Sequence, residues 1–201
     1  MGRPSKGEAK KALIVQTALK LFSRNGYSAT TTKQIAEACG VAEGLLFYYF
    51  GSKEELMRTV VRTFSFAELA RGHGEEWRAL TGKEALIRFA TLYLSFLERH
   101  RDYLALIWSP ELIRDERATG EVTSLIRGMV EEGGRLVARA ASADGGGPQP
   151  SVHTVETGVS MLLSSLLAYF AIQGRSGERT PEADDAYVRE AVDIVWSGVF
   201  R

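Results

Sequence analysis

The sequence has almost none of the residues that build disulfide scaffolds, zinc modules or redox sites. Its 201 residues include one cysteine, Cys39, and three histidines that lie far apart. One cysteine can form neither an internal disulfide nor a C-x-x-C zinc pair, so we expect a reducing compartment and no metal. Cys39 is predicted to be a small, inward-facing helix residue rather than a redox sensor, because no second cysteine could resolve it.

Motifs of catalysis and cofactor binding are also missing. The sequence has no nucleophile elbow, no P-loop and no Rossmann glycine pattern. Its first eleven residues, MGRPSKGEAKK, hold no apolar run of the kind found in secretory signals. We therefore expect a cytoplasmic protein that is not an enzyme and that has no cofactor.

Charge is missing from one long stretch, between Glu156 and Arg175. This length could cross a membrane, but the stretch contains serine, threonine, glutamine and glycine. A buried helix or a subunit interface is the better interpretation. Small and leucine-rich helices here and near the C-terminus predict a four-helix dimer interface. The residues expected in it are Ser164, Leu167, Ala168, Ala171, Tyr187, Ala191, Ile194 and Val195.

A net charge of zero conceals a basic N-terminal end. Residues 1–56 carry eight basic and five acidic residues, and six of the basic ones come before residue 25, where Glu8 is the only acid. Such an asymmetry favours a polyanionic partner, although it is a weak signal by itself.

The spacing of apolar residues predicts an all-α protein with no sustained strand. A first helix over residues 8–25 follows an arm of residues 2–7 and has apolar side chains on one face. A shorter helix after Arg101 is interrupted near Ser109-Pro110. Besides the first helix, five long helices are predicted, over residues 53–71, 83–100, 118–142, 151–173 and 181–200.

Residues 31–50 are predicted to form two short helices joined by a glycine turn. Thr31 and Gln34 form a capping-box pattern, Gly40 ends the first helix, and the second begins near residue 42. Leu46 and Phe50, one turn apart, are expected to pack onto the first helix of the chain, because helices this short cannot stand alone. This arrangement is helix-turn-helix geometry.

The run from Gly26 to Leu56, with the residues before it, resembles the TetR family of bacterial transcriptional regulators. The resemblance covers about residues 10–56, and the rest of the chain matches only in length and helical layout. Ala42, Leu45 and Phe47 depart from the Ser, Thr and Tyr that the family often has there. The matching positions are Leu21-Phe22, Gly26-Tyr27, Thr31, Ile35-Ala36, Gly40-Val41, Gly44, Leu46, Tyr49-Phe50, Ser52-Lys53 and Glu55-Leu56.

The resemblance implies an N-terminal three-helix helix-turn-helix DNA-binding domain with a basic arm, residues 1–52, and a helical ligand-binding and dimerisation domain, residues 53–201. The implied function is a ligand-responsive regulator, usually a repressor, that binds a palindromic operator as a homodimer. An apolar or amphipathic small molecule would release it. The alternative is a helical dimeric DNA-binding protein or interaction module without a small-molecule effector. The apolar Leu45 and Phe47 favour an interaction module whose helix-turn-helix is vestigial.

Phosphate contacts are expected from hydroxyl groups, helix N-termini and cations. Lys33 could reach either a phosphate or a guanine edge. The alternatives are that Thr31 only caps its own helix and that Lys33 and Lys53 are solvated surface lysines. Arg3 and Lys6 could enter the minor groove as an arm or remain a solvated tail. The expected residues are Thr31, Thr32, Lys33, Tyr48, Tyr49, Arg3 and Lys6, and the resemblance adds Lys53.

Base contacts are expected from the second short helix. Glu43 can accept a hydrogen bond from cytosine N4, although a plain surface role is an equal alternative. Gly44 lets the helix backbone approach the groove closely. Leu45 and Phe47 make this surface apolar, which suits the methyl group of thymine.

The resemblance also implies a ligand pocket in the second domain. Aromatic and methionine residues spread over several helices could line it, although most residues of this kind pack in a core. The candidates are Phe64, Phe89, Tyr93, Phe96, Trp108, Met129, Met161 and Tyr169.

Overall fold

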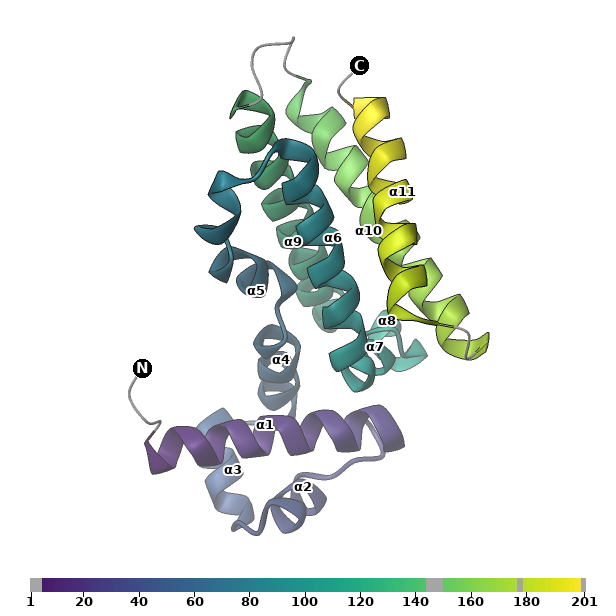
Figure 1. The fold of residues 1–201 in the computed structure, drawn as a ribbon. Helices are drawn as coiled ribbons and strands as arrows, with labels where there is room; N and C mark the ends of the chain where they lie inside the picture. Colours follow the sequence, from purple (N-terminus) through teal and green to yellow (C-terminus); the bar gives the residue numbers. More distant parts are fainter. Residues whose placement is uncertain (1–4, 144–149, 177–178, 200–201) are drawn as a thin grey trace. The chain divides into compact units, whose positions relative to one another are not determined.

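The computed structural model describes residues 5–143, 150–176 and 179–199, and within these ranges the chain is helical without strands (Figure 1). The α-helices are α1 (Lys6–Asn25), α2 (Thr32–Cys39), α3 (Glu43–Phe50), α4 (Lys53–Thr63), α5 (Phe66–Gly72), α6 (Gly82–Arg99), α7 (Arg101–Ile107), α8 (Pro110–Arg114), α9 (Glu116–Ala143), α10 (Val152–Ser176) and α11 (Pro181–Val199). A short 3₁₀ helix, η1, covers Glu76–Ala79. The predicted all-α class is confirmed.

The chain divides into two compact units. The first contains Met1–Ser65 and His100–Ser124, and the second contains Phe66–Arg99 and Leu125–Arg201. The first residues of α9 therefore belong to one unit and the later residues to the other. The functional division expected at residue 52 stays a prediction.

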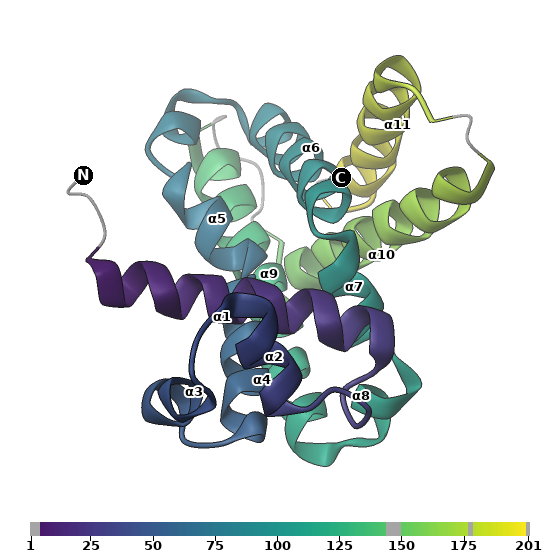
Figure 2. The same ribbon diagram turned by 90° about the horizontal axis from the view of Figure 1, so that it is seen from below.

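Helix α1 is the platform of the first unit, and α2, α4 and α7 all pack against it. Ile14, Ala18 and Phe22 of α1 are almost completely buried, as are Leu46 and Phe50 of α3. Figure 2 shows the two short helices beside α1 and α4. The sequence pattern was right about the inward residues of both short helices, apart from Cys39, which is half-buried.

Helix α1 begins earlier than the sequence pattern predicts. Ser5 is its N-cap: the Ser5 hydroxyl accepts a hydrogen bond from the Glu8 amide at 3.2 Å, and the Glu8 carboxylate accepts one from the Ser5 amide at 2.7 Å. This capping box starts the helix at Lys6, so Lys6 is a helical residue and not part of an arm. Arg3 lies outside the described residues.

The sequence pattern predicts a single helix over residues 53–71, and this prediction is wrong. Helix α4 ends at Thr63, Phe64 has a non-helical backbone, and α5 begins at Phe66. Phe64 packs against His100 and Tyr103 in the first unit, whereas Phe66 packs among the aromatic rings of α6 in the second. The interruption lets two rings that are two residues apart join different cores.

The second unit is built on α6, which contacts α5, α10 and α11. Phe89, Tyr93 and Phe96 of α6 surround Phe66, with ring centroids 5.0–5.5 Å away. Helix α9 closes on this cluster at Gly133, where a β-carbon would lie 2.7 Å from Val159 and 3.0 Å from Phe89. A side chain at this position would overpack the core.

Helix α10 contains the charge-free stretch. Its segment Val152–Gly174 is long and apolar enough to cross a membrane by length and composition, with a mean hydropathy of 1.6. In this fold α10 packs against α6 and α11, and nearly half of the segment is buried. A core helix of this kind passes the same test, so the segment is weak evidence for a membrane span.

Candidate nucleic-acid interface

The start of α2 is organised by a capping box. The Thr31 hydroxyl accepts a hydrogen bond from the Gln34 amide at 3.1 Å, and the Gln34 side chain accepts one from the Thr31 amide at 2.8 Å. Gly40 has a positive φ of 64° and ends the helix. Thr31 therefore has the capping role predicted for it, and Lys33 in the same first turn is exposed.

Thr32 joins the two short helices. Its hydroxyl donates a 2.5 Å hydrogen bond to Oε1 of Glu43, the first residue of α3. Ala42, the N-cap residue of α3, makes no side-chain capping bond. The contact between Thr32 and Glu43 thus ties the start of α2 to the start of α3, and sequence spacing did not reveal it.

Helix α3 has one buried and one exposed face. Leu46 and Phe50 are buried, Leu45 and Tyr49 are half-buried, and Gly44 is exposed. Phe47 is 45% exposed and Tyr48 is 80% exposed, which is unusual for aromatic side chains. Gly44, Phe47 and Tyr48 have i, i+3, i+4 spacing and share the outward side of the helix.

One cation of α1, Lys11, lies beside the end of α3. Nζ of Lys11 lies 5.7 Å from the centroid of the Phe50 ring, within the range of a cation–π contact. Gly7 of α1 also lies close to α3, since a β-carbon built at this glycine would be 3.4 Å from the Tyr49 hydroxyl oxygen. Lys6, Lys10 and Lys11 are all exposed. Sequence reasoning named only Lys6 among these three, although the lysine pair was a visible signal.

Lys53, the first residue of α4, is held by the loop between α1 and α2. Its ammonium lies 4.3 Å from the centre of the Tyr27 ring and donates a 3.4 Å hydrogen bond to the carbonyl of Ser28. The position of this lysine therefore depends on the conformation of residues 27 and 28.

Glu111 of α8 fixes that loop. Its carboxylate accepts hydrogen bonds from the amides of Tyr27, at 2.9 Å, and Ser28, at 2.7 Å, and also from the Ser28 hydroxyl. Partial burial alone would raise the pKa of Glu111, but the bonds from Ser28 and Tyr27 and the charge of Lys53 lower it below its ordinary value of 4.5. Burial, followed by the charge of Glu54, raises the pKa of Tyr27 to about 12.

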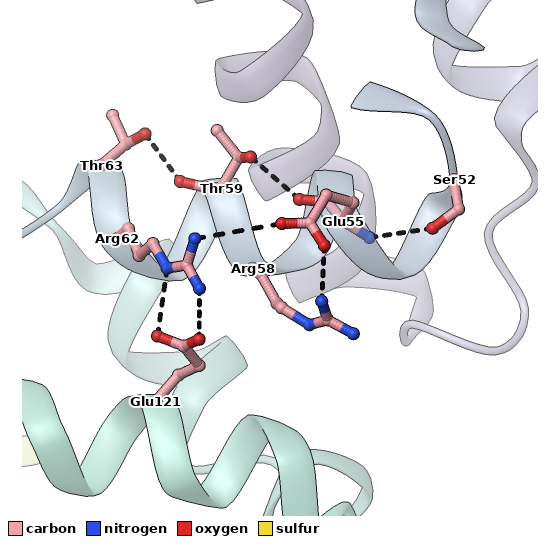
Figure 3. A network of polar contacts seen from close by, with 7 residues as sticks. All are labelled: Ser52, Glu55, Arg58, Thr59, Arg62, Thr63 and Glu121. Atoms are coloured by element: carbon pink, nitrogen blue, oxygen red, sulfur yellow. Dashed lines mark hydrogen bonds and ion pairs between the residues drawn. The ribbon is translucent and has the colours of Figure 1, made fainter. Parts of the chain in front are cut away.

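Figure 3 shows a second polar network, which joins α4 to the first residues of α9. Arg62 donates to both carboxylate oxygens of Glu121, one of them at 3.1 Å, and its guanidinium lies 3.9 Å from Glu55. Glu55 also pairs with Arg58 at 2.5 Å. Ser52 caps α4 by accepting the Glu55 amide at 3.1 Å. These bonds hold α4 at its first turn and near its last.

The match to known proteins agrees with this geometry. The family model described as "Bacterial regulatory proteins, tetR family" matches residues 14–60, which include the later part of α1, all of α2 and α3, and most of α4. Residues 14–60 therefore form a TetR-family N-terminal domain. The curated relatives are described as HTH-type transcriptional regulators, and α2 and α3 are the two short helices predicted for a helix-turn-helix.

Several curated regulators are similar to this chain. It is 32% identical to the Bacillus subtilis regulator YuxN over 102 residues, which cover 48% of this chain and 33% of YuxN. It is 35% identical to the Escherichia coli O157:H7 regulator RutR over 128 residues, which cover 59% of this chain and 57% of RutR. The chain thus spans between one third and three fifths of the length of these two relatives.

A solved structure extends the likeness to the whole fold. The Bacillus subtilis transcriptional regulator FadR, in complex with stearoyl-CoA, is 17% identical, with a TM-score of 0.72. The similarity covers 94% of this chain and 98% of that one. At this identity it shows a common fold.

The eight predicted pocket residues do not come together in one place. Phe64 and Trp108 belong to the first unit, and Trp108 is half exposed. Phe89, Tyr93 and Phe96 form one buried cluster on α6, and Tyr169 stacks on Tyr187 with ring centroids 4.0 Å apart. Met129 is half-buried on α9.

Met161 lies with the predicted interface residues instead. It is 64% exposed and lines a groove of about 370 Å³ between α10 and α11, together with Tyr187, Ala191, Ile194 and Val195. Ser164, Ala168 and Ala171 are exposed on α10, and Leu167 is half-buried. Half of the predicted interface residues are therefore exposed in the monomer, and the other half are half-buried.

We predict that Glu111→Gln lowers the free energy of unfolding at pH 7 by roughly 1–2 kcal/mol, since it weakens hydrogen bonds to a charged acceptor. Because folding lowers the pKa of Glu111, its contribution is complete above pH 4.5 and is lost as the pH falls through the folded-state pKa. The difference from the unmodified protein should therefore shrink below pH 4.5 in denaturant titrations. Glu37→Gln, at an exposed position of α2, is the control. A difference that does not depend on pH would contradict the role of the Glu111 charge.

Proposed function

We propose that this TetR-family regulator is a repressor that binds a palindromic operator as a homodimer and leaves it when an apolar or amphipathic small molecule binds. The observation that carries the DNA-binding part is the outward face of α3. Gly44 sits inside the helix without a positive φ, and a β-carbon there would meet nothing within 4 Å. Nothing within the described fold requires a glycine at this position, whereas a close approach of DNA would.

The other predicted contacts surround this face. Lys33 and Lys6 are exposed cations that suit phosphate, and Lys11 joins them. Lys53 is presented by the Tyr27 ring and the Ser28 carbonyl. The hydroxyl groups of Thr31 and Thr32 already take part in hydrogen bonds within the protein. We therefore assign the phosphate contacts at these positions to backbone amides at the N-terminus of α2. The Tyr48 and Tyr49 hydroxyls complete the phosphate set, and Leu45 and Phe47 are assigned to thymine methyl groups.

Homodimer formation is supported by the open side of α10. Thr157, Ser160, Met161, Ser164, Ala168, Ala171 and Ile172 are all exposed, carry no charge and recur at helical spacing. Met161 is 64% exposed, Ile172 is 66% exposed, and Ile194 of α11 is 67% exposed. An uncharged stripe with exposed large apolar side chains is typical of a surface covered by a second copy. The groove between α10 and α11 lies along the same side.

Effector binding is assigned to the second unit. The aromatic cluster of Phe66, Phe89, Tyr93 and Phe96 brings one polar group among apolar rings. The Tyr93 hydroxyl is protonated at neutral pH and can donate a hydrogen bond, and burial raises its pKa further, to about 12. FadR, which shares the fold, was solved with stearoyl-CoA, an amphipathic acyl compound. A protein that meets DNA and a metabolite in this way would act in the cytoplasm.

Gly44→Ala is predicted to separate stability from DNA binding. An exposed helical alanine is more stable than glycine by roughly 0.5–1 kcal/mol, so the free energy of unfolding should rise. The added methyl group should weaken operator binding, which we would measure by fluorescence anisotropy on a duplex obtained by selection from a randomised library. Gly120→Ala, in open space on α9, is the matched control and should raise stability with unchanged DNA binding. If Gly44→Ala binds DNA as tightly as Gly120→Ala does, α3 does not lie at the DNA interface.

Ala168→Arg is predicted to break the dimer. It places an unpaired charge in the middle of the uncharged stripe, and burying it costs several kcal/mol. Sedimentation should show twice the 22.1 kDa chain mass for the unmodified protein and a monomer for the variant. Ala105→Arg, exposed on α7, should remain dimeric. A monomeric unmodified protein at micromolar concentration would refute this interface.

Stearoyl-CoA is predicted to weaken operator binding by roughly 5- to 150-fold, the usual range of coupling between two sites. Coenzyme A without an acyl chain is the control and should have no effect, because it lacks the apolar chain that would pack among the aromatic rings. The measurement is a DNA titration at fixed ligand. If neither compound nor any other acyl compound changes DNA affinity, the protein is a DNA-binding regulator without this effector class.

A further inference from the structure

Glu43 is the only charged side chain of α3, and it stands at the helix end that enters the major groove first in helix-turn-helix proteins. The side chain is half-buried, and its Oε1 accepts the 2.5 Å hydrogen bond from Thr32. Among the described residues, no lysine or arginine forms an ion pair with it, and no second hydrogen bond to its carboxylate is present. One carboxylate oxygen is therefore fixed by the protein, and the other remains available as an acceptor.

The helix dipole favours a negative charge in the first turn of α3 by roughly 0.3–1 kcal/mol, but the contact with Thr32 does not require that charge. The bond from Thr32 needs only an oxygen acceptor, which the side chain of glutamine also provides. A carboxylate near a phosphate backbone is repelled, and the repulsion of two unit charges is about 1 kcal/mol at 4 Å even in water. The charge thus costs DNA affinity unless the carboxylate accepts a hydrogen bond from the DNA itself. Cytosine N4 is the donor that carboxylates read in the major groove.

We propose that Glu43 reads a cytosine in each operator half-site and that Thr32 is the positioning residue that holds its carboxylate for this contact. The inference rests on the proposed DNA-binding function and adds the base that is read. Thr32 supplies its only hydroxyl proton to Oε1, which limits the rotation of the carboxylate and leaves Oε2 for the N4 amino group. The cytosine preference is therefore a joint property of two helices, because Thr32 begins α2 and Glu43 begins α3.

The test is selection of binding sites from a randomised duplex library with the full-length chain, followed by affinity measurements on single-base variants of the selected site. The unmodified protein should prefer cytosine at one position of each half-site by roughly 5- to 150-fold. Glu43→Gln should move the preference at that position from cytosine to adenine, since glutamine pairs with N6 and N7 of adenine. Other positions of the site should keep their preferences.

Thr32 is tested by a pair of variants. Thr32→Val keeps the shape but removes the hydroxyl, so discrimination at the cytosine position should fall while the other positions remain unchanged. Thr32→Ser restores a hydroxyl and should restore the preference. A merely structural role of Thr32 would instead lower affinity for every sequence alike, and the serine variant guards against a loss of folding. Glu37→Gln on α2 is the control and should leave all preferences unchanged.

Two results would overturn the inference, and they differ from failure of the proposed function. If Glu43→Ala binds all sequences more tightly by the same factor, Glu43 only repels phosphate and reads no base. If Glu43→Gln leaves the selected site unchanged, the carboxylate is not the reader. If the unmodified protein enriches no sequence at all, the DNA-binding proposal itself fails, and this inference falls with it.

Discussion

Two helices of eight residues each are too short to be stable alone, and the DNA-binding surface depends on how α1 buries one side of them. Leu46 and Phe50 of α3 and Ile35 and Ala36 of α2 are inaccessible to solvent or nearly so. Each of these short helices commits its apolar face to this core and presents the opposite face outward. The unusual exposure of Phe47 and Tyr48 is a direct result of that arrangement.

Around this core, polar contacts set the positions of the groups that would meet DNA. Thr32 connects α2 with α3, and Glu111 holds the loop that supports Lys53. The paired carboxylate oxygens of Glu121 hold Arg62 near the end of α4. Each of these contacts joins different elements, so the positions of the candidate DNA contacts are set by more than the hydrophobic core.

The sequence predicted much of the local structure and little of the contacts between distant residues. Periodicity and caps located α2, α3 and their inward residues, because those signals lie within a few residues of one another. The bonds between Glu111 and residues 27 and 28 join positions 83 and 84 apart, and no spacing rule reaches so far. The break at Phe64 was missed because residues 53–71 have helical periodicity throughout. Helix α10 is apolar almost all round, so its pattern could not decide that Met161 is exposed.

The position of the lysines on helices other than α3 has a consequence for how ionic strength acts on this regulator. The lysines assigned to phosphate lie on α1, α2 and α4, whereas α3 has no cation. The number of counterions released from DNA scales with the number of phosphates that the protein neutralises, and it does not depend on the base sequence. Added salt should therefore shorten the time spent on any DNA while leaving the ratio between operator and random sites almost unchanged. In a cell whose ionic content varies, occupancy of the operator relative to the rest of the chromosome would stay nearly constant.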